Sequence, residues 1–133
     1  LAKGIAWMVT EKSCLNQAFN FTNTDVFRWK HLWPRIAECF DMVPGSVRPL
    51  KLEEVMSERD EVWKSIAKKF GLKTSSLDQV ANWGFADATL ERYWDEILSH
   101  NKCRSLGFHE WDETETRFVH RLKQYQNSAI LPT

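Results

Sequence analysis

The sequence predicts a mainly α-helical fold with one or two short strands, in the α+β class. Two observations carry this prediction. Apolar residues recur at helical spacing in several separate segments, whereas only one short run alternates as a half-buried strand does. The chain has 133 residues, the size of a single domain, and we therefore expect one lobe over 1–133 with a sizeable core.

The N-terminal part predicts a helix followed by the one convincing strand. Three apolar residues lie at helical spacing within 4–15, namely Ile5, Met8 and Val9. Residues 18–22 alternate, and the turn-forming run 23–25 follows them. One strand cannot form a sheet, because its backbone donors and acceptors need partners. Together with the uncapped apolar start at Leu1, the lone strand leads us to expect a chain cut from something longer.

The strongest helical pattern covers 29–40. Its apolar residues recur at the spacing of one helix face, and they are Trp29, Leu32, Trp33, Ile36, Ala37 and Phe40. Pro34 lies inside this segment and removes one backbone donor, so it should kink the helix or mark a restart. A loop with prolines follows, and within it 47–50 is expected to form a brief edge strand.

The second half of the sequence predicts further helices. Their expected positions are 52–58, 60–70, a short helix that opens at 74–76, a stripe over 90–98 that ends near 106–107, and a last helix from 112 onward. Gly71 is placed to stop the helix before it. The last helix has an acidic start and a basic end, which suit the helix dipole.

Composition excludes several classes of partner. Lys plus Arg and Asp plus Glu both number 18, and a formal charge of zero gives no electrostatic reason to expect nucleic acid or an anionic membrane. No run approaches the roughly 20 apolar residues of a membrane span. Three widely spaced cysteines, Cys14, Cys39 and Cys103, are not typical of a disulfide framework. We therefore expect a reducing compartment and a cytoplasmic protein.

Motifs for cofactor, metal or nucleophilic chemistry are absent. The five glycines lie too far apart for a dinucleotide-binding turn or a P-loop, so no cofactor is expected to bind this segment. His100, Cys103 and His109 are more simply interpreted as surface histidines and a buried thiol than as zinc ligands. No serine lies in the context of a nucleophile elbow. These motifs thus assign no metal ligand and no catalytic residue.

The run 83–87 is the best candidate for a ligand pocket. Trp83 and Phe85 flank Gly84 outside a clean helical stripe, where a bend could present both rings to a ligand. Asp87 follows in apolar surroundings. It is interpreted either as a buried cap or hydrogen-bond acceptor, or as a pocket carboxylate with a raised pKa.

One stretch is long and unusual enough to suggest a family. Residues 20–33 resemble a stretch of the progesterone 5β-reductase/iridoid synthase-like enzymes, which are atypical extended short-chain dehydrogenases/reductases. The similarity continues in order through 61–63, 83–87, 101–102, 107–108 and 130–132. The chain departs from the family pattern at Thr24, where the family usually has Gly, and at Pro34.

The resemblance implies that the chain is the C-terminal third of such an enzyme, a substrate lobe that carries one late strand of the Rossmann sheet near 18–22. In that family an N-terminal Rossmann half, absent here, binds NADPH. The Tyr-x-x-x-Lys pair of short-chain reductases is also missing, since Ile97 follows Tyr93 at the fourth position. The resemblance places Phe85 in the substrate pocket with Trp83 beside it, and we add Trp7 and Met8 to the expected lining.

Three functions remain open at this stage. The first, implied by the resemblance, is the substrate-binding portion of an NADPH-dependent reductase of the activated C=C bond of an enone or enal. The second is a cofactor-independent isomerase or cyclase of an apolar small molecule, with Asp87, Tyr93 or His31 as acid or base. The third is a non-catalytic module that binds a missing Rossmann half or forms a homodimer.

Overall fold

The computed structural model describes all residues, 1–133, and contains helices but no strand. The α-helices are α1 (Ala2–Thr10), α2 (Trp29–Glu38), α3 (Leu52–Ser57), α4 (Asp60–Phe70), α5 (Trp83–Leu90), α6 (Asn101–Ser105) and α7 (Thr114–Asn127). Two short 3-10 turns, η1 (Lys12–Cys14) and η2 (Leu77–Gln79), complete the list. No helix combines the length and the hydrophobicity that crossing a bilayer would require.

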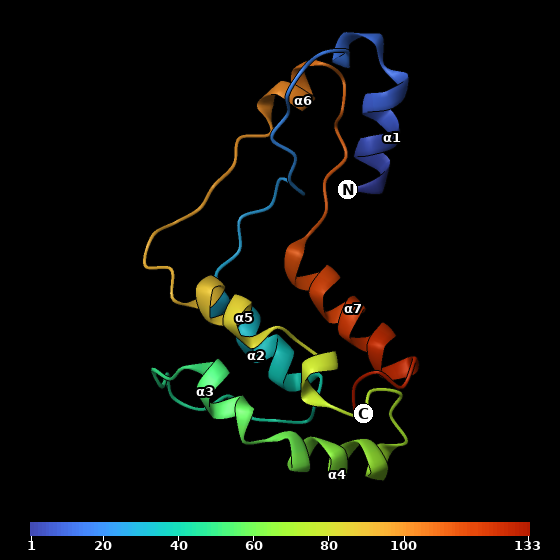
Figure 1. Cartoon of the computed structure of the whole chain (residues 1–133). Coiled ribbons are helices and arrows are strands. Elements are labelled where there is room, and N and C mark those ends of the chain that lie inside the picture. The colour runs from blue at the N-terminus through green and yellow to red at the C-terminus, as the bar shows by residue number, and fades with distance from the viewer.

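The helices form two groups that long irregular segments connect (Figure 1). One group contains α1 and α6, and the other contains α2, α3, α4, α5 and α7. The N-terminus lies beside the first group and the C-terminus beside the second. Segments 15–28, 91–100 and 106–113 have no regular structure and run between the two groups.

An aromatic cluster holds the first group together. The ring of Phe108 lies 5.1 Å from that of Trp7 and 5.2 Å from that of Phe21. Gly4 of α1 is buried against Phe21, and a methyl group in its place would overlap that ring. Glycine thus allows the helix backbone to approach an aromatic ring closely. The buried thiol of Cys103 donates to the backbone oxygen of Asn20 over 3.6 Å.

The second group has a small apolar core around Leu32, which is fully buried. Trp63 and Ala67 of α4 and Leu77 of η2 are also buried. α2 packs against α7, and α3 packs against α5. The predicted helix over 29–40 is confirmed as α2, which continues through Pro34 without a restart. Gly71 ends α4 in the left-handed conformation, with a φ of +61°, as predicted.

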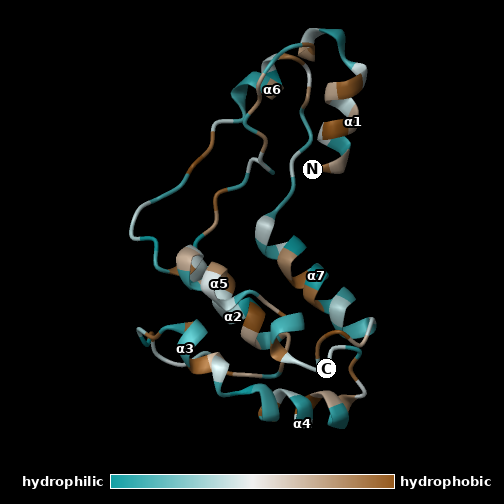
Figure 2. Ribbon diagram, viewed as in Figure 1, coloured by the Kyte–Doolittle hydropathy of each residue, from teal (hydrophilic) through white to brown (hydrophobic).

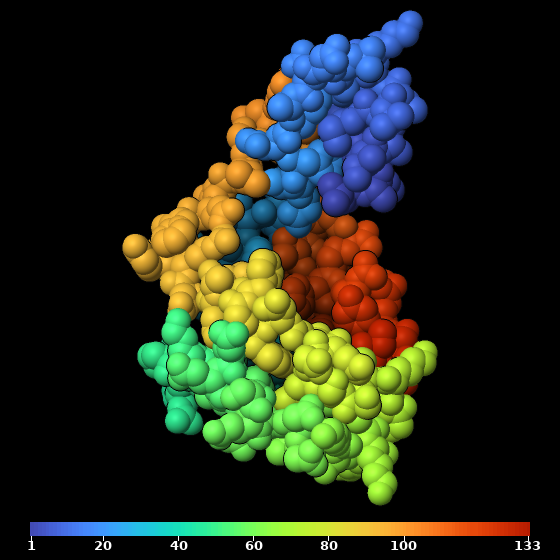
Figure 3. Space-filling model, in the orientation of Figure 1, coloured from blue at the N-terminus to red at the C-terminus, as the bar shows by residue number.

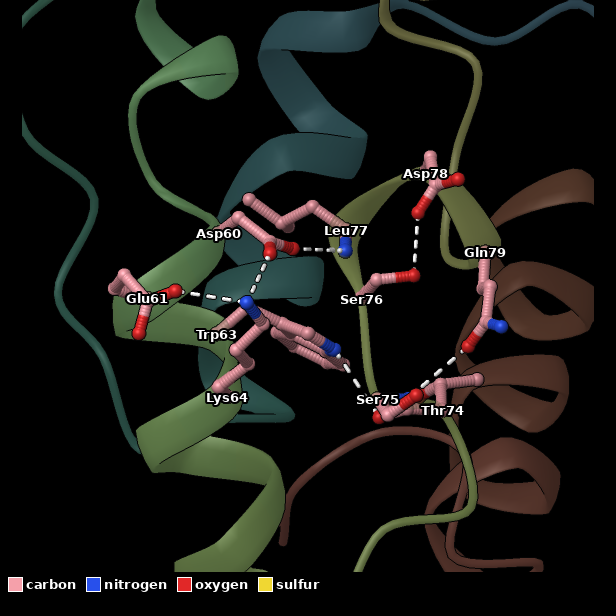
Figure 4. Close-up of polar contacts among 10 residues, drawn as sticks. All are labelled: Asp60, Glu61, Trp63, Lys64, Thr74, Ser75, Ser76, Leu77, Asp78 and Gln79. Carbon is pink, nitrogen blue, oxygen red and sulfur yellow. Dashed lines mark hydrogen bonds and ion pairs between the residues drawn. The ribbon is translucent and has the colours of Figure 1, made fainter.

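Three aspartates fasten segments that are remote in sequence. Asp87 of α5 accepts hydrogen bonds from the backbone N–H groups of Leu52 (2.8 Å) and Glu53 (3.0 Å), at the start of α3. Asp60 accepts from the N–H of Leu77 over 3.0 Å at the start of η2 (Figure 4). Asp25 accepts from the N–H of Thr114 at the start of α7. Each carboxylate satisfies N–H groups that have no partner inside their own helix.

The chain exposes far more surface than a compact domain of its size. Its accessible area is 10424 Å², whereas a compact 15.7 kDa monomer would expose about 7,300 Å². Only ten of the 133 residues are buried. Figure 3 accordingly shows an elongated molecule, and Figure 2 shows hydrophobic residues along the ribbon of α1. The expected sizeable core is therefore wrong for this chain.

The predicted strands over 18–22 and 47–50 are wrong. Residues 18–22 have no regular structure and no ladder of hydrogen bonds. The N–H of Thr22 donates instead to Nδ1 of His100 over 3.4 Å. A strand is defined by its pairing, and within this chain no other segment presents a matching edge.

The predicted helix over 90–98 is also wrong, and the predicted bend at 83–87 is part of a helix. Residues 83–90 form α5, and 91–100 have no regular structure. The apolar side chains of 90–98 are exposed. An amphipathic helix is stabilised mainly by burial of its apolar face, so the spacing alone does not produce a helix there.

Replacement of Asp87 by Asn should lower the midpoint of thermal unfolding by a few degrees. Its backbone hydrogen bonds from Glu53 and Leu52 hold the pKa of Asp87 below the ordinary value of 3.8. A lowered folded pKa adds stability that is present above pH 3.8 and is lost as pH falls through the folded pKa.

Circular dichroism melts at neutral and acidic pH measure this effect. Glu58→Gln is the control, because Glu58 is an exposed carboxylate with an ordinary negative φ and makes no side-chain hydrogen bond. Equal melting of Asp87→Asn and Glu58→Gln would contradict the capping role.

Candidate functional site

A hollow of about 640 Å³ lies between two irregular segments, and we take it as the candidate site. Residues 22–29 form one wall, and residues 89–101 together with Arg104 form the other. The volume is within the range of about 300–1,000 Å³ that small-molecule sites occupy. Each wall contributes apolar side chains, which are Val26, Phe27 and Trp29 on one side and Trp94, Ile97 and Leu98 on the other.

An ion pair joins the two walls. The guanidinium of Arg28 donates through both terminal nitrogens to the carboxylate of Asp95, with 2.9 Å between Nη2 and Oδ2. These bonds and the charge of Arg28 hold the pKa of Asp95 below its ordinary value. Such two-point Arg–carboxylate contacts fix relative geometry better than single contacts do. The pair therefore sets the spacing of the walls.

The wall at 22–29 is anchored to the start of α7. Asp25 accepts a hydrogen bond from the N–H of Thr114 over 2.8 Å, and this bond keeps the pKa of Asp25 low. The side chain of Asn23 donates to Oγ1 of Thr114 and to the backbone oxygen of Asp112. Thr24, between these two anchors, has a φ of +66°. A β-branched residue is strained in that left-handed region.

His100 closes one end of the hollow and is only 5% exposed. Its Nδ1 accepts from the N–H of Thr22, whereas its buried Nε2 has no hydrogen-bond partner. Burial lowers the pKa of His100 below 6.5, and the nearby Arg104 lowers it further. The imidazole is therefore held in its neutral form. The expectation that His100 lies on the surface is wrong, while the expectation of a buried Cys103 is confirmed.

The four residues expected to line a substrate pocket do not gather at one place. Trp7 and Met8 are half-buried on α1, where Trp7 packs against Phe108. Phe85 on α5 is 71% exposed, and Trp83 beside it is half-buried with an indole nitrogen that lacks a partner. None of the four lines the hollow.

The three residues considered as acid or base are also separate. His31 is exposed on α2, and Tyr93 is 93% exposed beside Trp94. Asp87 is buried and accepts two backbone N–H groups, which confirms the interpretation as a hydrogen-bond acceptor. The alternative of a raised pKa is wrong, because those bonds lower the pKa of Asp87.

The residues of this chain do not form a cradle for a dinucleotide. A pyrophosphate is normally held by a glycine-rich turn between a strand and a helix, and the chain has no strand and no closely spaced glycines. No group of three or more His, Cys, Asp or Glu side chains lies close enough together to hold a metal ion.

Comparison with known proteins finds relatives of this chain. The chain is 33% identical to an (S)-8-oxocitronellyl enol synthase of Antirrhinum majus, over 99% of this chain and 35% of that protein. It is 33% identical to the ISY2 enzyme of the same name from Nepeta cataria, over 95% of this chain and 34% of that protein. It is 31% identical to the 3-oxo-Δ(4,5)-steroid 5-β-reductase of Arabidopsis thaliana, over 99% of this chain and 34% of that protein.

The chain is a relative of the progesterone 5β-reductase/iridoid synthase-like enzymes. The resemblance seen in the sequence is thereby confirmed. The chain spans about a third of the length of the curated relatives that it matches. No protein-family model matches it.

Thr24→Gly restores the residue usual in these enzymes and should raise stability. Relief of the left-handed conformation offers about 1–2 kcal/mol, and the added freedom of the unfolded chain removes part of that gain, so we expect about 0.5–1 kcal/mol. Urea unfolding measures the difference. The same change at Thr116 in α7 should destabilise, because that residue is helical. A loss of stability in Thr24→Gly would show that the Thr24 contacts outweigh the strain.

The neutral state of His100 should make the fold sensitive to mild acid. The unfolded chain binds a proton at this residue near pH 6.5 and the folded chain only at lower pH, so stability falls as pH drops below 6.5. The slope should reach at most about 1.4 kcal/mol per pH unit. His100→Gln should remove this component from urea unfolding curves. Arg104→Gln leaves the imidazole buried and should reduce the pH dependence of stability only in part. If His100→Gln has the same slope as the wild type, His100 is not the source of the pH dependence.

Proposed function

We propose that this chain is the substrate-binding portion of an NADPH-dependent reductase that acts on the activated C=C bond of an enone or enal. The observation that carries this proposal is similarity over nearly the whole chain to two kinds of relative, the 8-oxocitronellyl enol synthases and a 3-oxo-Δ(4,5)-steroid 5-β-reductase. The second relative's name specifies a 3-oxo steroid with a Δ(4,5) double bond, which is an enone. The hollow has a volume suited to a small molecule, and its walls combine apolar side chains with a larger number of polar and charged ones.

The cofactor would be held by polypeptide outside this chain, because the residues present do not fit a dinucleotide. The large exposed area supports that arrangement. Exposed apolar residues occur on α1, α2 and α5, among them Ile5, Trp33 and Phe85. Exposure of many large apolar side chains is typical of a surface that another domain covers. We propose that a Rossmann domain covers this surface. The relatives are about three times as long as this chain, which leaves room for such a domain.

The role proposed for Phe85 comes from the family resemblance and is compatible with its exposure. Phe85 does not line the hollow, so its exposed ring on α5 would contact the part of a substrate that lies outside the hollow, against the second domain. A reducing compartment such as the cytoplasm is proposed as the location, and the unpaired cysteines are compatible with it.

A hybrid enzyme tests the function directly. This chain replaces the matching third of the Antirrhinum majus relative, and NADPH oxidation is followed with an enal or with a 3-oxo-Δ(4,5)-steroid. We expect NADPH oxidation that depends on the added substrate. Within the hybrid, Phe85→Ala should lower kcat/KM about tenfold, since removal of a phenyl contact costs about 1.5–3 kcal/mol at most.

Phe70→Ala is the matched control, because Phe70 ends α4 outside the proposed contact region and should leave kcat/KM unchanged. A folded hybrid that binds NADPH and reduces neither substrate would overturn the proposed function. Equal activity of Phe85→Ala and Phe70→Ala would overturn only the role of Phe85.

A further inference from the structure

The wall of the hollow formed by residues 91–99 is held almost entirely at its ends. Glu91 at its start donates its N–H to Asp87 and pairs through its carboxylate with Lys51. At its other end lies the buried His100. Between these ends no backbone N–H or C=O of 92–99 bonds to backbone anywhere in the chain. All nine residues are exposed.

Between its ends this segment makes one ion pair with a remote part of the chain, that of Asp95 with Arg28. The other ion pair in the segment, Arg92 with Glu96, is internal and holds it to nothing else. Arg28 lies on the opposite wall, immediately before α2. The contact therefore spans the hollow and fixes the middle of an otherwise unsupported segment.

The same segment carries large apolar side chains that have no core to join. Trp94 and Ile97 line the hollow and remain 57% and 63% exposed. Exposure of such side chains is unfavourable in water, by roughly 25 cal/mol for each Å² of apolar area. An apolar molecule in the hollow would give both side chains a surface to cover.

We propose that residues 91–99 form a lid that closes over an apolar ligand in the hollow, with the ion pair between Arg28 and Asp95 as its latch. The class of ligand rests on the proposed function, whereas the latch does not. Both partners of the pair are about half exposed, so the latch is weak and sensitive to salt. A weak latch suits a lid that must open to admit and release a ligand.

Limited proteolysis of the purified chain tests the latch without any ligand. Chymotrypsin cleaves after Tyr93 and Trp94, and cleavage is faster when the residues around these bonds are free to leave the wall and fit the protease. Arg28→Gln leaves the sequence of the segment unchanged and should raise the rate of cleavage there about two- to fivefold. Salt should accelerate cleavage of the wild type and have little effect on the variant.

Arg35→Gln is the matched control, because it removes an arginine of α2 that pairs only with Glu38 and should leave the rate unchanged. The double variant Arg28→Asp with Asp95→Arg reverses the pair and should restore slow cleavage. Equal cleavage in wild type and Arg28→Gln, or failure of the reversed pair to restore protection in a variant with a wild-type circular dichroism spectrum, would overturn the latch.

Closure over a ligand has its own readout. A 3-oxo-Δ(4,5)-steroid added to the wild type should slow cleavage after Tyr93 and Trp94, and Arg28→Gln should show less protection. Unchanged cleavage at saturating steroid would overturn the lid. The two proposals can fail separately. If the hybrid enzyme shows no reductase activity but steroid still protects residues 91–99 from cleavage, the proposed reaction is wrong and the lid is supported.

Discussion

Carboxylates that cap remote helices are the constraint on which the rest of this fold depends. Asp25 accepts a hydrogen bond from a backbone N–H 89 residues away in sequence, and Asp60 accepts one from 17 residues away. Asp87 accepts two, from N–H groups 35 and 34 residues away. The first N–H groups of any helix lack partners within it, so a carboxylate there gains both a hydrogen bond and the favourable end of the helix dipole. In a chain with so few buried apolar residues, these polar contacts determine which segments lie together.

The apolar core of this chain is divided between two groups of helices, and the hollow lies between the irregular segments that connect them. The helices of the second group bury a small set of side chains, and the aromatic cluster around Phe108 buries another. Between them run irregular segments that have no apolar layer to cover them. The hollow lies between two of those segments, which an ion pair joins, and the hydrogen bond from Thr114 to Asp25 holds one of them to the start of α7.

The sequence predicts the parts of this fold that are locally determined. The spacing of apolar residues predicts α2 and α4, because each helix buries part of the face that the spacing defines, at Leu32 in α2 and at Trp63 and Ala67 in α4. The same reasoning fails over 90–98, where the apolar stripe has nothing to pack against within the chain. It fails at 18–22 as well, since strand formation depends on a neighbour that local sequence cannot reveal.

The candidate site was harder to predict than the helices. Arg28 and Asp95 are 67 residues apart, and no local pattern marks them as partners. Thr24 was the one available signal, because it stands where the related enzymes usually have Gly, and the structure gives it a positive φ. The polar role of Asp87 followed from its apolar surroundings, which demand that a carboxylate find donors.

The contact of Gly4 with Phe21 links two positions that the sequence separates. Because the ring lies where a β-carbon would stand, any side chain at position 4 forces either α1 or the ring to move. Among relatives that keep this contact, the two positions should therefore change together, with a bulkier residue at 4 accompanied by a smaller one at 21. Covariation at this pair would report the docking of α1 onto the aromatic cluster even in sequences whose structures are unknown.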